Sequence, residues 1–174
     1  MSNPIPEKLI NFRVYLEGTD LLGTADVTLP SLESLTETVK GAGLAGEVES
    51  PVIGHFKSMT LGLKWRVVHK EACKLAVLKA HQLEVRGAVQ VMDHAAGTYT
   101  AVPTKLVVKG IPKKLALGKM DPGKLQDTET ELEVTYLKLT VDGEEQIELD
   151  KYNFIYKVQG EDQLAKVRSA LGLE

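Results

Sequence analysis

The sequence predicts one mostly antiparallel α+β domain. The chain has 174 residues, which is about the length of a single domain. Hydrophobic residues make up 43% and charged residues 26%, as in ordinary globular proteins. Most of the chain alternates apolar and polar side chains with a period of two, which is typical of half-buried strands, and only two segments have a helical period. We therefore treat residues 1–174 as one domain.

Three strands are predicted in the first half of the chain. Apolar side chains alternate with polar ones over Phe12–Leu16, Met59–Val67 and Leu83–Val91. The sequence Gly18-Thr19-Asp20 predicts a turn directly after the first of them. Two further candidates follow in the second half, at Thr98–Val108 and Lys113–Lys119, and Pro103 weakens the middle of the former.

The clearest strand pair lies near the C-terminus. Thr128–Val141 and Glu145–Val158 flank Asp142-Gly143, which is a strong hairpin signal. Both predicted strands change phase midway, so that the apolar side chains move to the other face. We expect a β-bulge or a sharp bend in each.

Two helices are predicted, Lys70–Ala80 and Glu161–Leu171. The second presents Leu164, Val167 and Leu171 on one stripe and ends at Gly172. The longest stretch without a periodic pattern is Val39–His55, a Gly-rich segment that we expect to be a loop. Loops of this length are more often functional than short ones.

Several classes of protein are disfavoured by composition. No apolar run approaches the length of a membrane-spanning helix, so we expect no membrane anchor. The segment 1–10 lacks the apolar centre of a signal peptide, which predicts a chain made and kept in the cytosol. The single cysteine, Cys73, excludes an internal disulfide and a multi-cysteine zinc site. A net charge of −3 argues against a general nucleic-acid binder.

No catalytic or cofactor-binding arrangement emerges from the motifs. Residues 41–46 match G-x-G-x-x-G, but the acidic residues and Pro51 that follow do not suit the helix start that a dinucleotide site needs. The carboxylates at 142–150 do not fit a calcium loop, and the four histidines lack zinc spacing. Cys73 is expected to be a small buried thiol, and Trp65 a core residue. We therefore predict neither enzymatic activity nor a metal or cofactor.

Charge is distributed unevenly along the chain. Residues 57–124 carry thirteen basic and four acidic side chains, whereas residues 125–150 carry one basic and nine acidic. Such segments can neutralise each other within one subunit, or they can form complementary patches between subunits. The sequence leaves both alternatives open.

Three segments stand out in order along the chain. They are Val27-Thr28-Leu29-Pro30-Ser31-Leu32, the Gly-rich run 41–48 with Pro51, Gly54 and Met59-Thr60-Leu61, and the C-terminal runs 147–155, 158–164 and 168–172. In these segments the chain resembles the major tail tube proteins of contractile-tailed bacteriophages and related phage-tail-like bacteriocins, and the resemblance extends over almost the whole chain. The family usually has Met where this chain has Leu44, which is a volume-conserving change.

The resemblance implies a structural protein with an antiparallel β-sandwich or half-barrel, a flanking helix and a C-terminal helix. Six subunits would form a ring whose strands join into one barrel around a channel, and rings would stack into a tube. The implied partners are tail sheath, tape measure and baseplate proteins. DNA would pass through the lumen without specific binding, or the tube would puncture a membrane. The implied location is the virion tail, assembled in the cytoplasm of the bacterial host.

Two candidate contact sites follow from this resemblance and from the charge pattern. The Gly-rich loop would reach an adjacent ring, whereas the acidic hairpin would lie against a neighbouring subunit or the lumen. Strands near 57–68, 82–93, 128–141 and 145–157 are expected at the lumen. The inter-ring loop residues are Gly41, Gly43, Leu44, Gly46 and Val48. The inter-subunit hairpin residues are Asp142, Gly143, Glu144 and Glu145.

Other functions remain open from the sequence alone. A secretion-system tube protein for effector delivery has the same shape class. A monomeric β-sandwich that binds a ligand or a carbohydrate is a different class, and it predicts a species near 19 kDa in solution. Whether the parent particle is a phage or a DNA-free bacteriocin is likewise open.

Overall fold

The computed structural model describes residues 4–20 and 23–173; residues 1–3 of the N-terminal segment considered above lie outside that part. The fold is mostly antiparallel β-structure, with 59% of the described residues in strands and two short helices among them. The elements are β1 (Pro4–Leu16), β2 (Thr19–Asp20), β3 (Thr24–Thr28), β4 (Ser34–Val39), β5 (Val48–Phe56), β6 (Thr60–Trp65), α1 (Lys70–Lys74), β7 (His81–Asp93), β8 (Thr98–Ala116), β9 (Thr128–Val141), β10 (Glu144–Asp150), β11 (Ile155–Val158), β12 (Glu161–Asp162) and α2 (Ala165–Leu171).

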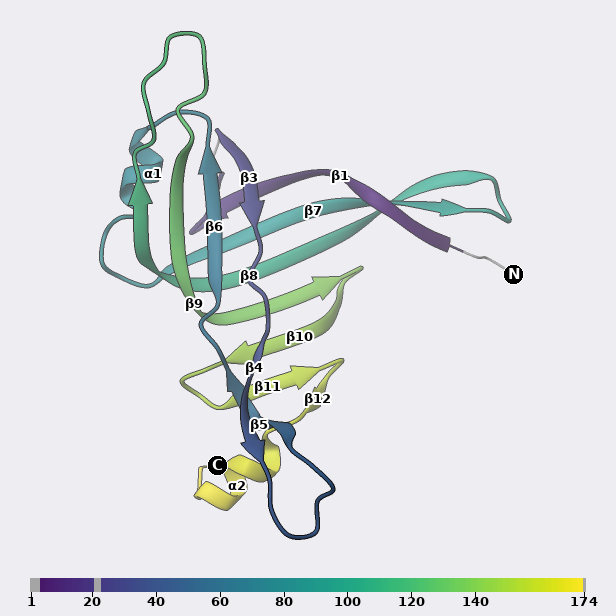
Figure 1. The fold of residues 1–174 in the computed structure, drawn as a ribbon. Coiled ribbons are helices and arrows are strands. Elements are labelled where there is room, and N and C mark those ends of the chain that lie inside the picture. The colour runs from purple at the N-terminus through teal and green to yellow at the C-terminus, as the bar shows by residue number, and fades with distance from the viewer. Residues whose placement is uncertain (1–3, 21–22, 174) are drawn as a thin grey trace.

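Ten strands form one antiparallel sheet, in the order β12-β11-β10-β9-β8-β7-β1-β2, with β6 beside part of β9 and β3 beside β6 (Figure 1). Strands β4 and β5 form a separate two-stranded sheet. The predicted strand Phe12–Leu16 begins earlier, at Pro4, and the predicted turn after it leads into β2. The expected mainly β, antiparallel class is confirmed.

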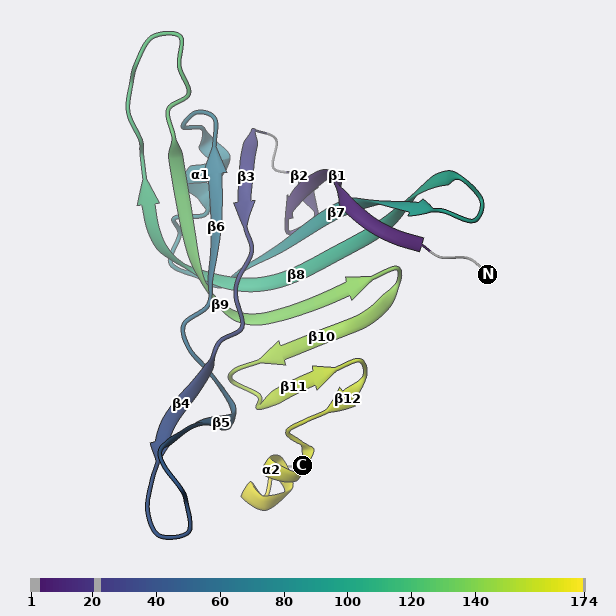
Figure 2. The same cartoon turned by 45° about the vertical axis from the view of Figure 1, so that its right-hand side comes forward.

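A bulge in β9 bends the sheet into a half-barrel. Strand β9 pairs with β8 along its length, but on its other edge it pairs with β6 as far as Glu133 and with β10 from Tyr136 onward. The register against β8 skips Thr135, which confirms the bulge that the phase change in this strand predicts. Strands β3 and β6 consequently cross the direction of β7 and β10 steeply in both views (Figures 1 and 2).

The second phase change has a different cause, and the prediction of one continuous strand over Glu145–Val158 is wrong. The chain turns back at residues 151–154, so β10 and β11 are antiparallel neighbours. The carboxylate of Asp150 accepts hydrogen bonds from the backbone N–H groups of Tyr152 and Asn153, both at 3.0 Å, and this stabilises the turn.

Strand β8 unites the two segments predicted at Thr98–Val108 and Lys113–Lys119. Pro103 is tolerated within it because its backbone faces the end of β9. Its carbonyl oxygen accepts a hydrogen bond of 2.9 Å from the N–H of Asp142 in the β9–β10 turn, where the ladder ends. A missing N–H at this position therefore breaks no bond between regular strands.

The first helix is much shorter than predicted. After Lys74 the backbone tightens into turns in which Ala76 and Val77 donate to carbonyls three residues earlier, at 3.1 and 3.3 Å. Ala72 and Leu75 are buried in the core, whereas Val77 and Leu78 are exposed. Cys73 is exposed as well, so the expectation of a buried thiol is wrong.

The C-terminal helix begins at Ala165 rather than at Glu161. Glu161 and Asp162 pair with β11 instead, and Asp162 then accepts a hydrogen bond from the N–H of Leu164. Gly172 ends the helix with a left-handed φ of 70°, as predicted. Of the predicted apolar stripe only Leu164 is buried, and Leu171 remains 57% exposed.

The Gly-rich segment is not a loop throughout, which corrects the expectation for Val39–His55. Its two sides pair as β4 and β5, with Val39 opposite Val48, and only residues 40–47 form the connection. The resulting hairpin continues from the β3–β6 pair and projects from the body of the molecule (Figure 2). We call residues 34–56 the arm.

The core fills the concave side of the bent sheet. It combines side chains of β6, β7, β8, β9 and α1, among them Trp65, whose indole N–H donates to the Thr130 hydroxyl at 3.0 Å. The sequence expectation for Trp65 is thus confirmed. In the described part of the chain, no helix has the length and hydropathy to cross a membrane.

Candidate assembly surfaces

The tip of the arm is exposed and glycine-dependent. Gly41, Gly43 and Gly46 have φ values of 145°, 94° and 151°, and a Cβ atom at any of them would meet nothing within 4 Å. Leu44 and Val48 are 47% and 53% exposed. These five predicted inter-ring residues therefore lie together on a protruding hairpin whose backbone a partner can approach closely.

The base of the arm, by contrast, is packed against the C-terminal strands. The rings of Phe56 and Tyr156 meet edge to face at 5.0 Å between centroids. Gly54 lies so close to Leu164 that a Cβ atom would overlap the leucine side chain. The N–H of Lys57 donates to the carbonyl of Glu33 at 2.8 Å. The direction of the arm is thus set by packing at its base.

The predicted inter-subunit hairpin has its turn where the sequence places it. Asp142 and Gly143 have φ values of 52° and 81°, and Glu144 pairs with Val141, which describes a two-residue turn with both central residues left-handed. Asp142 and Glu144 are exposed. Glu145 instead forms an ion pair of 2.5 Å with Lys138 of the same hairpin.

Much of the uneven charge is neutralised within the subunit. Lys114 lies 3.2 Å from Glu129 and 2.9 Å from Glu131. Lys113 and Glu133 are 3.7 Å apart. These pairs join the basic segment 57–124 to the acidic segment 125–150, because β8 and β9 are neighbours. Of the two alternatives left open by the sequence, the structure supports intramolecular neutralisation for these groups.

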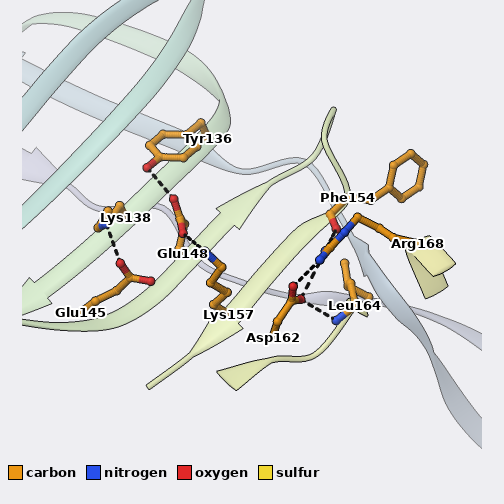
Figure 3. Close-up of polar contacts among 9 residues, drawn as sticks. All are labelled: Tyr136, Lys138, Glu145, Glu148, Phe154, Lys157, Asp162, Leu164 and Arg168. Carbon is orange, nitrogen blue, oxygen red and sulfur yellow. Dashed lines mark hydrogen bonds and ion pairs between the residues drawn. The ribbon is translucent and has the colours of Figure 1, made fainter. Parts of the chain in front are cut away.

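The convex side of the sheet carries a continuous set of charged side chains, which we call the polar face. It spans β7 to β11, and its members contact one another across neighbouring strands. Figure 3 shows the part of it on β9, β10 and β11. Sequence analysis named only Glu145 among them as a contact residue, because the set depends on strand register. The polar face consists of Glu84, Arg86, Lys105, Lys109, Tyr136, Lys138, Glu145, Glu148 and Lys157.

Two carboxylates organise the polar face. Glu84 binds both Arg86 and Lys105, the latter at 3.3 Å. Glu148 binds Lys157 at 3.0 Å and accepts a hydrogen bond of 3.0 Å from the Tyr136 hydroxyl. Burial disfavours the charged form of each carboxylate, but the hydrogen bonds from these partners outweigh it and hold the pKa of Glu84 and of Glu148 below the usual value.

Two groups that bond to carboxylates of the polar face have raised pKa values. Burial and the hydrogen bond to Glu148 raise the pKa of Tyr136 to about 12. The hydrogen bond to Glu145 raises the pKa of Lys138. Beyond Lys157, Arg168 of α2 binds Asp162 and lowers the pKa of that carboxyl group (Figure 3). At neutral pH, Lys138, Asp162 and Arg168 are therefore charged, and Tyr136 is a neutral hydrogen-bond donor.

A third surface, which the sequence analysis missed, lies along β1. Strand β1 pairs with β7 on one edge, whereas β2 covers Tyr15 and Leu16 on the other, so the outer edge from Pro4 to Phe12 has no partner strand in the described part of the chain. Leu9 and Ile10 on this strand are 53% and 55% exposed. The prolines at 4 and 6 hid the N-terminal part of this strand, before Phe12, from pattern analysis.

An apolar groove of about 310 Å³ adjoins this edge. Side chains of β1, β3, β7, β8 and β9 line it, including Phe12, Val27 and Val89. Exposed apolar grooves of this kind mark contact surfaces more often than not. The groove and the side chains of β1 thus form one apolar surface, since Leu9 and Phe12 belong to both.

The histidines occupy unrelated positions, and no group of metal-ligating side chains occurs within residues 4–20 and 23–173. His69 begins α1, where its Nδ1 accepts from the N–H of Glu71, and His81 is buried with Nε2 2.9 Å from the Val77 carbonyl oxygen. His55 and His94 are exposed.

A family model for the phage tail tube protein FII matches residues 6–172. The chain belongs to this tail tube family. The tail tube protein of Escherichia phage P2 is 33% identical over 97% of this chain and 99% of that protein. The major tail tube protein of Serratia phage KSP20 is 28% identical over 97% and 98% of the two chains. The resemblance noted in the sequence is thereby confirmed.

A solved structure supports the same fold. A chain from the cryo-EM structure of the sheath/tube terminator of an extracellular contractile injection system superposes with a TM-score of 0.55. The match covers 78% of this chain and 97% of the other, at 13% identity. The FII-family chain is therefore a structural tail tube subunit with the fold of contractile-system proteins.

Proposed function

We propose that six copies of this chain close into a ring, and that stacked rings form the tube around a central channel. DNA passes through this channel in a phage, or the tube punctures a membrane in a phage-tail-like particle. The tube works together with sheath, tape measure and baseplate proteins, in a virion tail assembled in the host cytoplasm. The role is structural and requires neither catalysis nor a cofactor. The family match favours this function over a secretion-system tube.

The observation that carries the ring is the uncovered β1 edge with its adjoining apolar groove. An unpaired strand edge promotes association unless something covers it. In a cyclic ring unlike surfaces meet, so the β1 edge and groove of one subunit contact a different part of the next. A second copy of this chain is the partner that a tube subunit always has at hand. Exposed Leu9 and Ile10 supply the apolar contact.

The arm is the proposed contact between rings. Its base is held by Phe56, Gly54 and Lys57, so its direction is defined before assembly. Its tip carries the glycines and the small apolar anchors Leu44 and Val48. Ordering the eight residues 40–47 on a partner costs on the order of 8–16 kcal/mol of backbone entropy. Growth on an existing ring, where several contacts form together, offsets this cost best.

Electron microscopy of the purified protein tests the proposal. We expect rings or tubes, whereas a monodisperse 19.0 kDa monomer at high concentration would contradict it. The arm is tested by replacing residues 40–47 with Asn-Gly, which keeps Val39 opposite Val48 and supplies a two-residue turn. Single rings without long tubes are expected from this variant.

A matched control separates the tip itself from its charges. Lys40 and Glu47 form an exposed ion pair of 3.5 Å at the tip, and replacing both by Gln removes that pair but keeps the glycines. We expect this control to form tubes, because exposed pairs contribute little. Long tubes from the shortened variant would show that the arm does not join rings.

A further inference from the structure

The nine residues of the polar face include five cations and three carboxylates, and Asp162 lies opposite Lys157 at its margin. Arg86, Lys105, Lys109, Lys138 and Lys157 share it with Glu84, Glu145 and Glu148. The cations are also the outer groups, since the side chains of Arg86 and Lys105 are 57% and 44% exposed, whereas that of Glu84 is 20% exposed. Without their carboxylates, these cations would form a basic surface of the kind that binds phosphate.

Each carboxylate is placed to mask particular cations. Glu84 forms ion pairs with Arg86 and Lys105, Glu145 with Lys138, and Glu148 with Lys157. Lys109 lies over the ring of Tyr136, 5.4 Å from its centroid, and that tyrosine is itself bound to Glu148. The lowered pKa values of Glu84 and Glu148 agree with ionised carboxylates at neutral pH. The pairing is therefore distributed over the whole face and not confined to one point.

We propose that the polar face lines the channel, and that Glu84, Glu145 and Glu148 mask its cations so that duplex DNA passes without being bound. This inference rests on the proposed ring, in which the core, the arm and α1 occupy the other sides of the subunit. A channel repeats the face six times, so even weak phosphate contacts would add up. Of the strands expected at the lumen, the proposal keeps β7, β9, β10 and β11, adds β8 and leaves out β6.

The test removes the masking carboxylates and measures DNA binding. The variant Glu84→Gln/Glu145→Gln/Glu148→Gln exposes four cations per subunit while changing no side-chain length. Fluorescence anisotropy with a labelled 20-base-pair duplex is measured at 50 and 200 mM salt on rings or tubes verified by microscopy. We expect negligible binding by the wild type and clear binding by the variant at 50 mM salt.

Salt dependence gives the expected size of the effect. Each phosphate contact contributes about −0.9 to the slope of log K against log salt. If the duplex meets about four unmasked cations, its affinity falls on the order of a hundredfold between 50 and 200 mM salt. A gain without this dependence would contradict masking of phosphate-binding cations.

Two controls distinguish masking from a general change in charge. Glu17, Glu71 and Asp121 form ion pairs with Lys79, Lys74 and Lys124, outside the polar face and the arm. The variant Glu17→Gln/Glu71→Gln/Asp121→Asn changes the net charge equally and should leave DNA unbound. Conversely, adding Lys138→Gln and Lys157→Gln to the triple variant removes two unmasked cations and should return much of the affinity toward the wild-type level.

Comparing linear with closed-circular DNA tests whether the polar face lies inside the channel. A closed-circular plasmid cannot enter a ring or tube, whereas a short linear duplex can. Binding of the linear duplex alone supports a face inside the channel, and equal binding of both DNAs would overturn the lumen assignment. Should the triple variant form no rings, Glu84→Gln alone is measured in the same way, and rings that bind no more DNA than wild type would overturn the masking.

The masking can also be tested if the proposed ring does not exist. If the wild type itself forms no rings, the tube proposal fails, and the duplex is then titrated against monomeric wild-type and variant proteins, in which the polar face is equally exposed. No gain in binding by the variant monomer would refute the masking independently of assembly.

Discussion

Gly54 shows how a single residue can hold a large surface in place. Its φ of +72° lies in the left-handed region, and a Cβ atom there would overlap the side chain of Leu164. Leu164 is 2% exposed and sits just before α2, so it has little room to move. The glycine therefore allows the backbone of the arm to lie directly against the C-terminal segment.

We predict that Gly54→Ala lowers the stability of the subunit by about 1–3 kcal/mol beyond the backbone strain itself, because the new methyl group overpacks the contact. This corresponds to a fall in melting temperature of about 2–12 °C. Gly160→Ala is the matched control, since Gly160 has a φ of +82° and a Cβ atom there would meet nothing within 4 Å. Thermal unfolding followed by circular dichroism compares the two, and equal losses would show that Leu164 yields without cost.

Among the strands and turns, those that depend on neighbouring residues in the sequence could be predicted. The β9–β10 turn follows from Asp142-Gly143, and the bounds of β9 agree with the predicted strand. The phase change in the following strand was less informative, because a bulge and a turn shift the apolar side chains alike. The paired sides of the arm were missed since Gly54 and Pro51 interrupt β5 in the sequence.

The same distinction applies to the candidate sites. The arm tip was found because its glycines are contiguous in the sequence. The polar face was not found, because its residues are far apart in the sequence. Glu84 lies on β7, Lys138 on β9 and Glu148 on β10, and β7 pairs with neither of the other two strands. Only the observed register places them on one face, and the uncovered β1 edge likewise depends on knowing that β1 and β7 pair.

The polar face should make the stability of the sheet depend on acid pH. The pKa values of Glu84 and Glu148 are lowered from 4.5, and that of Asp162 from 3.8. The unfolded chain then binds more protons in acid than the folded one, so this contribution is complete above pH 4.5 and is lost as pH falls through the lower, folded-state values.

We therefore expect the melting temperature to be steady from pH 7 to about pH 5 and to fall below about pH 4.5. Differential scanning calorimetry over this range measures it. In Glu84→Gln/Glu148→Gln the fall should be shallower, because two of the responsible groups are absent. An unchanged acid profile in this variant would assign the loss of stability to carboxylates elsewhere.

On the scale of the whole molecule, the subunit is a half-barrel whose uncovered parts lie at its margins. The arm and strand β1 project from different sides of the sheet (Figures 1 and 2). The apolar groove adjoins β1, and the polar face lies on β7 to β11. Such separation suits a subunit that contacts neighbours around a ring, neighbours along a tube, and a channel. Bulges at Glu7 and Ile10 and the prolines of β1 restrict which strand can join this edge, which limits unspecific aggregation.

The ring contact can be tested at Ile10, which is 55% exposed in the isolated subunit. Ile10→Glu should leave the stability of the subunit within about 0.5 kcal/mol, because the side chain is at the surface. In a ring, however, six unpaired carboxylates would be buried at the interfaces, and each would cost several kcal/mol. We therefore expect folded monomers without rings by size-exclusion chromatography and electron microscopy.

Val77→Glu is the control, since Val77 is equally exposed but lies in the turn after α1. Rings from both variants alike would exclude the β1 edge from the interface and leave the outer edges of β12 and β3 as candidates for closure among the described strands.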